Sequence, residues 1–325
     1  MKAIVQDRYG PSDVLRLGEV DPPVAADGEV LVRVHAASVN ARDWHVMRGD
    51  PYVARMAFGL GAPKVRVRGT DFAGRVESVG AGVTRFRPGD EVFGEIDAAF
   101  AEYVRVPAGG ALEIKPANLT FEQAAALPLA ANTALMGLRD VARVRSGQRV
   151  LINGASGGVG TFAVQIAKAF GAEVTGVCST RNLELVRSLG ADRVIDYTRE
   201  DFTRNGGRYE VVFDLVGNRS LAECRRVLTP TGTLVLSGGG VSAGGSLFGP
   251  VRLITRGRLV SRFVRHRVLV LTAVPSRENL ATLRELAESG AITPVIDRTF
   301  PFGEAAEAVR YLEMDHARAK VVITV

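Results

Sequence analysis

Three glycines spaced three residues apart lie in the segment V-L-I-N-G-A-S-G-G-V-G, residues 150–160. Glycine permits a tight turn and a close approach of backbone to a pyrophosphate, whose charge is attracted by the N–H groups of a helix N-terminus. The spacing of Gly154, Gly157 and Gly160 differs from the commoner G-x-G-x-x-G. Because the glycines stand between a predicted strand and a predicted helix, with more strand–helix units after them, the segment predicts a dinucleotide site.

The residues roughly 20 positions further on indicate which dinucleotide binds. An NAD site places Asp or Glu at the end of the second strand, whereas an NADP site needs donors and positive charge there. The second predicted strand begins with its one acid, Glu173, and Ser179, Thr180 and Arg181 follow its end. A hydroxyl and a guanidinium suit a 2′-phosphate, because charge-assisted hydrogen bonds are the stronger ones. The sequence therefore favours NADPH over NADH. The alternative is that Ser179 caps the next helix and Arg181 is solvated.

Length and composition are those of a globular enzyme with about two domains. The chain has 325 residues, of which 46% are hydrophobic and 36 are glycine. No run approaches the roughly 20 apolar residues of a membrane span, and the start lacks the apolar core of a signal peptide. Two cysteines, Cys178 and Cys224, give no disulfide framework and indicate a reducing compartment. We expect a soluble, cytoplasmic protein.

The net charge of +6 has a local source. Residues 252–267, R-L-I-T-R-G-R-L-V-S-R-F-V-R-H-R, hold six arginines and no acid, and without them basic and acidic residues are equal in number. The segment predicts a basic amphipathic helix. Such a helix fits a solvated face, a flap beside the cofactor phosphates, or a peripheral contact with an acidic membrane surface or partner. No nucleic-acid-binding motif accompanies it, so no nucleic-acid partner is expected.

The order of the predicted elements separates two domains. Residues 1 to about 120 carry short alternating runs such as V-L-V-R-V-H-A-A-S-V, which predict antiparallel β structure. Further on, helical patterns alternate with strands near 149–153, 173–178, 193–196, 211–216 and 233–237. Such alternation predicts an α/β fold with a doubly wound parallel sheet. The closing strand K-V-V-I-T-V looks like the N-terminal part, so the expected domains are 1–121 with 294–325, and 122–293.

Several long motifs in this order resemble the medium-chain dehydrogenase/reductase superfamily: A-N-T-A-L-M-G-L, N-G-A-S-G-G-V-G and L-G-A-D-R-V-I-D-Y. The segment R-G-T-D-F-A-G-R-V-E-S-V-G-A-G-V-T-R-F-R-P-G-D-E-V resembles the quinone oxidoreductase (zeta-crystallin) signature. Residues 295–323 are similar to the zinc-free, NADPH-dependent branch around the reticulon-4-interacting protein. The resemblance covers nearly the whole chain. It implies a Rossmann domain and a GroES-like, mostly antiparallel β domain.

Zinc-containing members of this superfamily carry Cys-x-x-Asp early in the β domain and Gly-His-Glu after it. Here the corresponding stretches are N-A-R-D (residues 40–43) and G-T-D (69–71), so the cysteine and histidine ligands are missing. A catalytic zinc needs three protein ligands, and both cysteines lie far from these stretches in sequence. We therefore expect a metal-independent enzyme.

Without a metal Lewis acid, a positioned hydride can still reduce an activated C=C bond. The carbonyl of a quinone or an α,β-unsaturated ketone already delocalises the developing charge. The resemblance implies that Asn40 and Asp43 lie near the nicotinamide ribose and the substrate cleft, and that Thr133 lies beside the nicotinamide. Candidate proton donors are Tyr52, His45 and Asp43, among which the sequence does not choose.

The resemblance also implies further cofactor contacts. Tyr197 is expected at the adenosine phosphate, together with Ser179 and Arg181. Pyrophosphate N–H groups are expected from Ser156, Gly157, Gly158 and Val159. The remaining expected contacts are Val216, Gly217, Ser237, Gly238, His316, Ala317 and Arg318.

Three functions stay open at this point. They are an NADPH-dependent quinone or enone reductase, another hydride-transfer enzyme such as a zinc-free alcohol dehydrogenase or enoyl-thioester reductase, and a non-catalytic NADPH-binding protein.

The strand R-V-L-V-L-T (267–272) should be the outer strand of the nucleotide-binding sheet. Because an unbroken apolar edge invites pairing across a two-fold axis, we expect a homodimer. The alternative is a monomer whose edge is covered by the arginine-rich segment.

Overall fold

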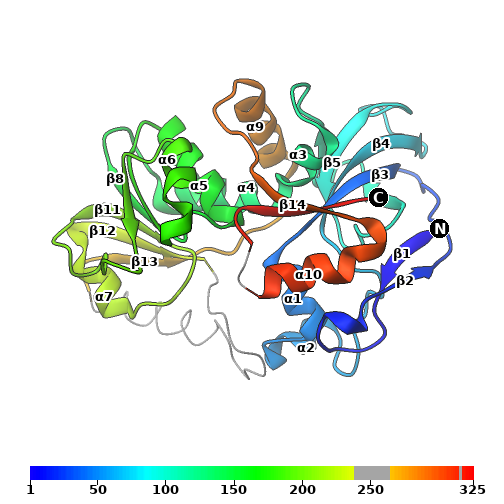
Figure 1. Cartoon of the computed structure of the whole chain (residues 1–325). Coiled ribbons are helices and arrows are strands. Elements are labelled where there is room, and N and C mark those ends of the chain that lie inside the picture. Colours follow the sequence, from blue (N-terminus) through cyan, green and yellow to red (C-terminus); the bar gives the residue numbers. More distant parts are fainter. Residues whose placement is uncertain (238–263, 315–316) are drawn as a thin grey trace. The chain divides into compact units, whose positions relative to one another are not determined.

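The computed structural model describes residues 1–237, 264–314 and 317–325. The chain forms two compact units, unit 1 (Met1–Asn132 and Pro275–Val325) and unit 2 (Thr133–Val274), which Figure 1 shows coloured along the sequence. Contacts between residues place 122–132 and 275–293 in unit 1, whereas the sequence predicted that they belong to the nucleotide-binding domain.

Unit 2 is built on a six-stranded parallel sheet with the order β10-β9-β8-β11-β12-β13. Its strands are β8 (Arg149–Asn153), β9 (Glu173–Cys178), β10 (Arg193–Asp196), β11 (Tyr209–Asp214), β12 (Leu228–Leu236) and β13 (Arg267–Val270). In chain order this is 3-2-1-4-5-6, the order of a Rossmann sheet. The predicted parallel sheet is confirmed, and β13 is its outer strand among the residues described.

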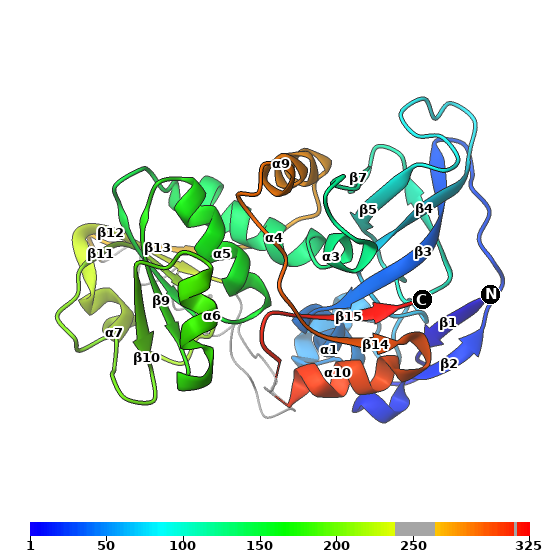
Figure 2. The same cartoon turned by 45° about the horizontal axis from the view of Figure 1, so that its top comes forward.

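Helices α5 (Gly158–Ala169) and α6 (Leu183–Ser188) lie against this sheet (Figure 2). Val150, Leu151 and Ile152 of β8 are fully buried, as in a parallel strand whose two faces are both covered. Helix α5 begins in the predicted glycine segment and buries eight of its 12 residues. The unit also contains α7 (Leu221–Arg226) and a π-helical turn at Met136–Ala142. The strand–glycine–helix order is therefore the one the sequence predicted.

Unit 1 is built on a seven-stranded, mostly antiparallel sheet in which β14 and β15 form a parallel pair. Strand β15 pairs antiparallel with β3, which confirms that the closing strand joins the N-terminal part. A small sheet of β1 (Lys2–Val5) and β2 (Arg16–Glu19) accompanies it. The seven strands are β3 (Glu29–Val39), β4 (Asp71–Val79), β5 (Glu91–Glu95), β6 (Tyr103–Pro107), β7 (Leu112–Ile114), β14 (Ile296–Pro301) and β15 (Lys320–Thr324).

Strand β3 contributes to two of the apolar clusters of this unit. Val32 and Val34 alternate with more exposed residues and pack with Phe72 of β4 in one cluster. Val39 belongs to a second cluster, with residues of β15 and α10 (Ala305–Glu313). Between the two, the pairing register of β3 with β4 shifts after Val34, as at a β-bulge.

Helices explain why unit 1 is larger than predicted. Helix α3 (Phe121–Ala125) packs on β3 and β4, and α9 (Arg277–Glu288) packs on β7. A hydrogen bond of 2.7 Å from Asn279 Nδ2 to Asn132 Oδ1 joins the two segments. Both therefore belong with the antiparallel sheet. The other helices of this unit are α1 (Ala41–Arg48) and α2 (Arg55–Phe58), and α4 (Pro128–Leu135) runs across the division.

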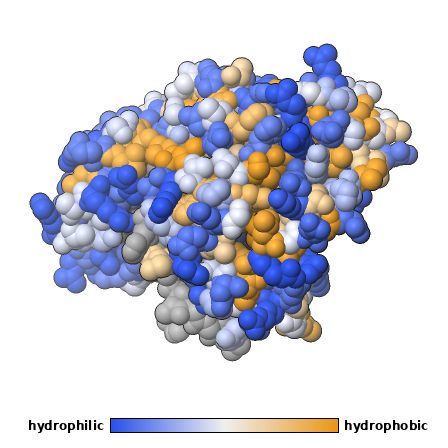
Figure 3. All heavy atoms as spheres, turned by 45° about the vertical axis from the view of Figure 1, so that its right-hand side comes forward, coloured by the Kyte–Doolittle hydropathy of each residue, from blue (hydrophilic) through white to orange (hydrophobic). Residues whose placement is uncertain are grey.

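The described surface carries exposed apolar side chains. Figure 3 shows hydrophobic residues among hydrophilic ones on one face, and the most exposed large ones are Val24, Met56 and Leu60. Apolar atoms form a large part of any protein surface, so this exposure alone marks no site. Among the described residues, no helix is both long and apolar enough to span a membrane. Residues 252–263 of the arginine-rich segment lie outside the described residues, so its interpretations stay predictions.

Candidate active site

A buried polar cluster joins the ends of three strands of unit 1. Lys320 Nζ lies 3.7 Å from Asp71 Oδ2, and both side chains are buried. Asn40 bridges them, because its Nδ2 donates to Asp71 Oδ2 (2.9 Å) and its Oδ1 accepts from Lys320 Nζ (2.6 Å). Asp71 also accepts from Ser38 Oγ and from the Leu129 N–H. Both ends of the Asn40 amide are therefore used within the protein.

Asp43 lies in the first turn of α1 with both carboxyl oxygens engaged. Oδ2 accepts the backbone N–H of Asn40 (2.8 Å), and Oδ1 accepts the hydroxyl of Thr70 (2.9 Å). Thr70 Oγ1 in turn accepts from Arg42 Nη1 (3.0 Å). Burial raises the pKa of Asp43 to about 6; the Asp71 carboxylate adds to this effect and the two hydrogen bonds oppose it. Asp43 therefore gains and loses a proton near neutral pH.

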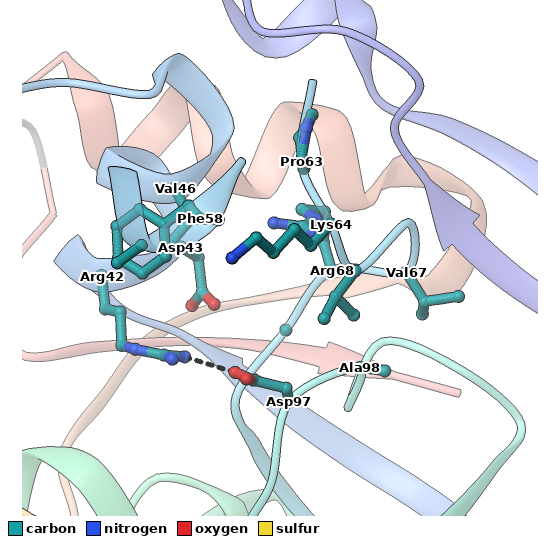
Figure 4. Close-up of a pocket in the computed structure, with 13 residues that line it drawn as sticks. Arg42, Asp43, Val46, Phe58, Pro63, Lys64, Val67, Arg68, Asp97 and Ala98 are labelled. Carbon is teal, nitrogen blue, oxygen red and sulfur yellow. Dashed lines mark hydrogen bonds and ion pairs between the residues drawn. The ribbon is translucent and has the colours of Figure 1, made fainter. Parts of the chain in front are cut away.

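A pocket of about 280 Å³ opens beside Asp43, and all of its lining residues belong to unit 1 (Figure 4). Its wall consists of residues from α1, residues between 57 and 69, and the pair Asp97 and Ala98. Arg42 forms an ion pair of 2.8 Å with Asp97 across the edge of this pocket, drawn dashed in Figure 4. The other charged lining residues are Lys64 and Arg68.

Of the three candidate proton donors, Asp43 lines this pocket and the other two do not. His45 Nδ1 lies 2.8 Å from the carbonyl oxygen of Asp50, and burial lowers the pKa of the imidazole. Tyr52 lies exposed in a short 3-10 helix, with its ring beside the guanidinium of Arg55. Of the three candidates that the sequence could not rank, Asp43 is therefore the one placed at the pocket.

In unit 2, the glycine segment forms a turn with space for a pyrophosphate. Gly154 has φ +89°, in the left-handed region that favours glycine. A Cβ on Gly160 would lie 2.0 Å from the carbonyl oxygen of Gly154, so the helix approaches the turn too closely for any side chain. A Cβ on Gly157 would meet no atom closer than 3.4 Å. That open space, beside the N–H groups of the first turn of α5, fits a bound dinucleotide.

The structure brings the predicted cofactor residues of unit 2 to one edge of its sheet. The carboxyl ends of parallel strands meet at this edge, where doubly wound sheets bind nucleotides. Their contacts with a cofactor stay predictions. The residues are Ser156, Gly157, Gly158 and Val159 after β8, Ser179 and Arg181 after β9, Tyr197 after β10, Val216 and Gly217 after β11, and Ser237 after β12.

The end of β9 is tied to the glycine turn by a residue that the sequence analysis did not single out. Asn182 Nδ2 donates to Ser156 Oγ (3.0 Å) and to Ser179 Oγ (3.2 Å). Arg181 and Tyr197 are both exposed at this edge. Asn182 therefore holds the hydroxyls of two of the predicted cofactor residues, Ser156 and Ser179.

A carboxylate from the neighbouring strand also reaches this edge. Asp196 of β10 pairs in register with Cys178 at the end of β9. Its oxygens accept the hydroxyls of Thr180 (2.5 Å) and Thr198 (2.7 Å), and the hydrogen bond from Thr180 is the main cause that lowers its pKa. The carboxylate of Asp196 thus already accepts two hydroxyl hydrogen bonds within the protein.

The remaining predicted residues have different surroundings. Thr133 is buried in α4. In unit 1, Ala317 packs against an apolar cluster, and Arg318 forms an ion pair of 3.3 Å with Asp297. Gly238 and His316 lie outside the described residues.

The side chains that stand where zinc-containing relatives have their ligands are engaged in hydrogen bonds within the protein. Asn40 and Thr70 are engaged as described above, and no described group of three or more His, Cys, Asp or Glu residues could hold a metal ion. Cys178 and Cys224 are buried in unit 2, and burial raises the pKa of their thiols to about 11 and about 12. These thiols stay protonated at neutral pH, whereas a metal ligand must be a thiolate.

Four ionisable residues near the site in unit 1 were not among the site residues predicted from the sequence: Asp71, Lys320, Arg68 and Glu95. Burial raises the pKa of Glu95 to about 8, and the Asp71 carboxylate adds to the shift. A signal was present for Lys320, which stands in the run A-K-V-V-I-T-V of the closing strand. A charged residue inside an apolar strand needs a partner when the strand is central.

Two family models match the chain: "Alcohol dehydrogenase GroES-like domain" over residues 26–116 and "Zinc-binding dehydrogenase" over residues 189–323. The "NAD(P)H oxidoreductase RTN4IP1, mitochondrial" of Mus musculus is 37% identical, over 100% of this chain and 89% of its own. The chain belongs to the medium-chain dehydrogenase/reductase superfamily, in its quinone oxidoreductase and RTN4IP1-like branch. The predicted Rossmann and GroES-like folds are confirmed with it.

Two further similarities describe this member of the superfamily more closely. The "NADPH-dependent alkenal/one oxidoreductase, chloroplastic" of Arabidopsis thaliana is 35% identical, over 99% of this chain and 79% of its own. The quinone oxidoreductase from Coxiella burnetii has a similar structure, with a TM-score of 0.86 at 31% identity, covering 100% of this chain and 99% of that one. The protein is an NAD(P)H-dependent oxidoreductase of the quinone or alkenal reductase type.

Proposed function

We propose that this oxidoreductase uses NADPH to reduce a quinone to its hydroquinone, or the C=C bond of an α,β-unsaturated carbonyl compound, without a metal ion. The observation that carries the proposal is the buried carboxyl of Asp43, which lines a pocket and whose pKa is raised to about 6. Either reduction needs a hydride and a proton. A carboxyl that holds a proton at the pocket wall suits the second requirement.

The preference for NADPH rests on the end of β9. NADPH, when bound, supplies the hydride. The open space at Gly157 suits its pyrophosphate, and Ser179 with the exposed Arg181 suits its 2′-phosphate. Dependence on NADPH is also part of the name of the Arabidopsis relative, which supports the same choice here.

Hydrogen bonding decides which oxygen of Asp43 carries the proton. Oδ2 accepts a backbone N–H from Asn40, and this donor cannot reverse, so the proton of the neutral carboxyl sits on Oδ1. When Asp43 is neutral, its Oδ1–H therefore donates to Thr70 Oγ1, which is the reverse of the hydrogen bond made by the ionised carboxylate. The hydroxyl proton of Thr70 is then free to be donated to another acceptor. Arg42 donates to the same oxygen and holds it in place. Asp43 and Thr70 thus form a short proton path that begins with Asp43 at the pocket wall.

A substrate panel tests this function. We expect NADPH oxidation with 9,10-phenanthrenequinone and with 3-penten-2-one, and none with the saturated ketone 2-pentanone. Turnover of the ketone alone would favour a zinc-free alcohol dehydrogenase, and turnover of an enoyl thioester alone would favour an enoyl-thioester reductase. Tight NADPH binding without turnover of any of them would favour a non-catalytic role.

A cytoplasmic location and a homodimer belong to the same proposal. Two free, buried cysteines support a reducing compartment. Two relatives carry "mitochondrial" and "chloroplastic" in their names, so fractionation of the source cells is the deciding measurement. The position of β13 as the outer strand of the sheet among the described residues supports pairing with a second copy.

A further inference from the structure

The pocket beside Asp43 contains a guanidinium that no described side chain pairs with. Arg68 is 5% exposed, and its Nε has no hydrogen-bond partner. Asp43 and Asp97 favour its charged form by charge alone, without a hydrogen bond, whereas burial lowers its pKa. Arginine stays charged in proteins, so Arg68 places in the pocket wall a cation with no hydrogen-bonded acidic partner among the described residues.

The acidic groups nearest to it are already engaged. Asp97 is paired with Arg42, and both oxygens of Asp43 accept hydrogen bonds from Asn40 and Thr70. Lys64 adds a second, exposed cation, whose side chain extends across the pocket in the view of Figure 4. The lining of this cavity of about 280 Å³ thus holds three cations, Arg42, Lys64 and Arg68, against two acids, Asp43 and Asp97, so its net charge is positive.

We infer that the pocket binds the carboxylate of an anionic substrate and that Arg68 recognises it. The inference rests on the proposed function and narrows its substrates to small enones or quinones that carry a carboxylate. A carboxylate presents two oxygens to the planar fork of a guanidinium, which gives strong and directional hydrogen bonds. Burial of an unpaired cation opposes folding, so its retention at the wall of a pocket is explained by a ligand that neutralises it.

Kinetics with a matched pair of substrates test this inference. The pair is 4-oxo-2-pentenoate, an enone with a carboxylate, and its methyl ester, which is neutral. We expect kcat/KM for the acid to exceed that for the ester. Arg68→Leu should lower kcat/KM for the acid by about 10- to 100-fold, mainly through KM, and leave the ester unchanged. The matched control is Arg66→Leu, because Arg66 is exposed and paired with Asp7, and it should change neither.

Binding of a saturated acid gives a readout without turnover. By calorimetry, 4-oxopentanoate should bind the full-length protein more tightly than its methyl ester, and Arg68→Leu should abolish the difference. The Tm of Arg68→Leu should equal or exceed that of the wild type, because an unpaired buried charge is removed. If neither these enones nor 9,10-phenanthrenequinone is reduced, the proposed function fails, whereas this binding measurement still decides the anion site.

Three results would overturn the inference. One is equal binding of the acid and the ester by the wild-type protein. Another is an Arg68→Leu variant that loses the acid and the ester alike and melts at a lower temperature, which would make Arg68 structural. The third is a raised KM for NADPH in that variant, which would assign Arg68 to a phosphate of the cofactor.

Discussion

Lys320 and Asp71 form an ion pair of 3.7 Å with side chains that are 2% and 0% exposed. Lys320 begins the last strand of the chain, and Asp71 begins β4, on the far side of β3. Burial lowers the pKa of Lys320 and raises that of Asp71, and the attraction between the two opposes both shifts. A buried pair adds little stability over apolar residues, but a single buried charge is costly. The pair therefore specifies where β15 attaches.

Loss of one partner should destabilise unit 1. Lys320→Met is expected to cost about 3–5 kcal/mol, because it leaves Asp71 charged and unpaired in the interior. The only tryptophan of the chain, Trp44, lies in α1 of this unit, so its fluorescence during urea unfolding reports the right transition. Adding Asp71→Asn to Lys320→Met should recover part of the loss. A double variant that is less stable than the single one would contradict the argument.

Asp43 should make catalysis depend on pH. Its neutral form predominates below a pH of about 6, so kcat for 3-penten-2-one should fall as the pH rises through about 6. Asp43→Asn should reduce kcat by about 100-fold and abolish this decline. Glu95→Gln is the control, because the pKa of Glu95 is raised to about 8 and its removal should leave the decline near pH 6 in place. An unchanged pH profile in Asp43→Asn would exclude Asp43 as the proton donor.

The same carboxyl should also affect stability. Its pKa in the folded protein lies above the ordinary value of 3.8, so the folded state binds the proton more tightly than the unfolded state. The contribution of Asp43 to stability therefore falls as the pH rises from about 4 to about 6. The measurement is the free energy of unfolding of the wild type and of Asp43→Asn between these pH values, followed by Trp44 fluorescence. The difference between the two proteins should change with pH. A constant difference would show that the carboxyl is not perturbed.

Arg181 should determine the preference for NADPH. Arg181→Ala should raise the KM for NADPH with little effect on NADH, at a cost of about 1.5–3 kcal/mol for a hydrogen bond to a charged group. Arg187→Ala is a suitable control, since Arg187 lies in the following helix α6 and pairs with Glu184. An unchanged ratio of NADPH to NADH in Arg181→Ala would remove the basis for this assignment.

Strand β13 should form the dimer contact. Val270→Pro removes a ladder donor, so it should weaken a dimer before it affects cofactor binding. Val194→Pro places the same change in β10, at the opposite edge of the sheet, and should leave the assembly intact. Light scattering measures the outcome, and a wild-type mass of 34.7 kDa rather than twice that value would rule out the dimer.

Activity should not require a metal ion. The side chains at the positions of the zinc ligands, Asn40 and Thr70, are engaged in hydrogen bonds within unit 1. A chelator should therefore leave the rate unchanged, with a zinc-dependent alcohol dehydrogenase treated in parallel as the control. One tightly bound zinc per chain, together with loss of activity in the chelator, would contradict the prediction.

The parallel sheet could be predicted from sequence because its signals are local. Strands β8, β9 and β10 have the bounds expected from their apolar runs, and a glycine turn follows the first of them. The assignment of helices to units was harder. Helices α3 and α9 have the same periodicity as those of unit 2, and periodicity does not indicate which sheet a helix packs on.

The candidate site was predicted in part for a related reason. Asn40 and Asp43 stand in one short segment that resembles a family motif, whereas their partners Lys320 and Thr70 come from distant strands. Arg68 shows the same limit. In the sequence it is one of several arginines near position 70, and only its burial without a partner distinguishes it from the exposed Arg66.

The placement of β15 has a consequence for synthesis on the ribosome. Residues of β3 and β4 emerge early, yet their sheet lacks a strand, and Asp71 lacks its cation, until residues 320–324 have been translated. Unit 2 is continuous from Thr133 to Val274, so it can fold while β15 is still being made. The unit whose residues are translated second is therefore completed first, and the antiparallel sheet of unit 1 is completed only when β15 has emerged from the ribosome.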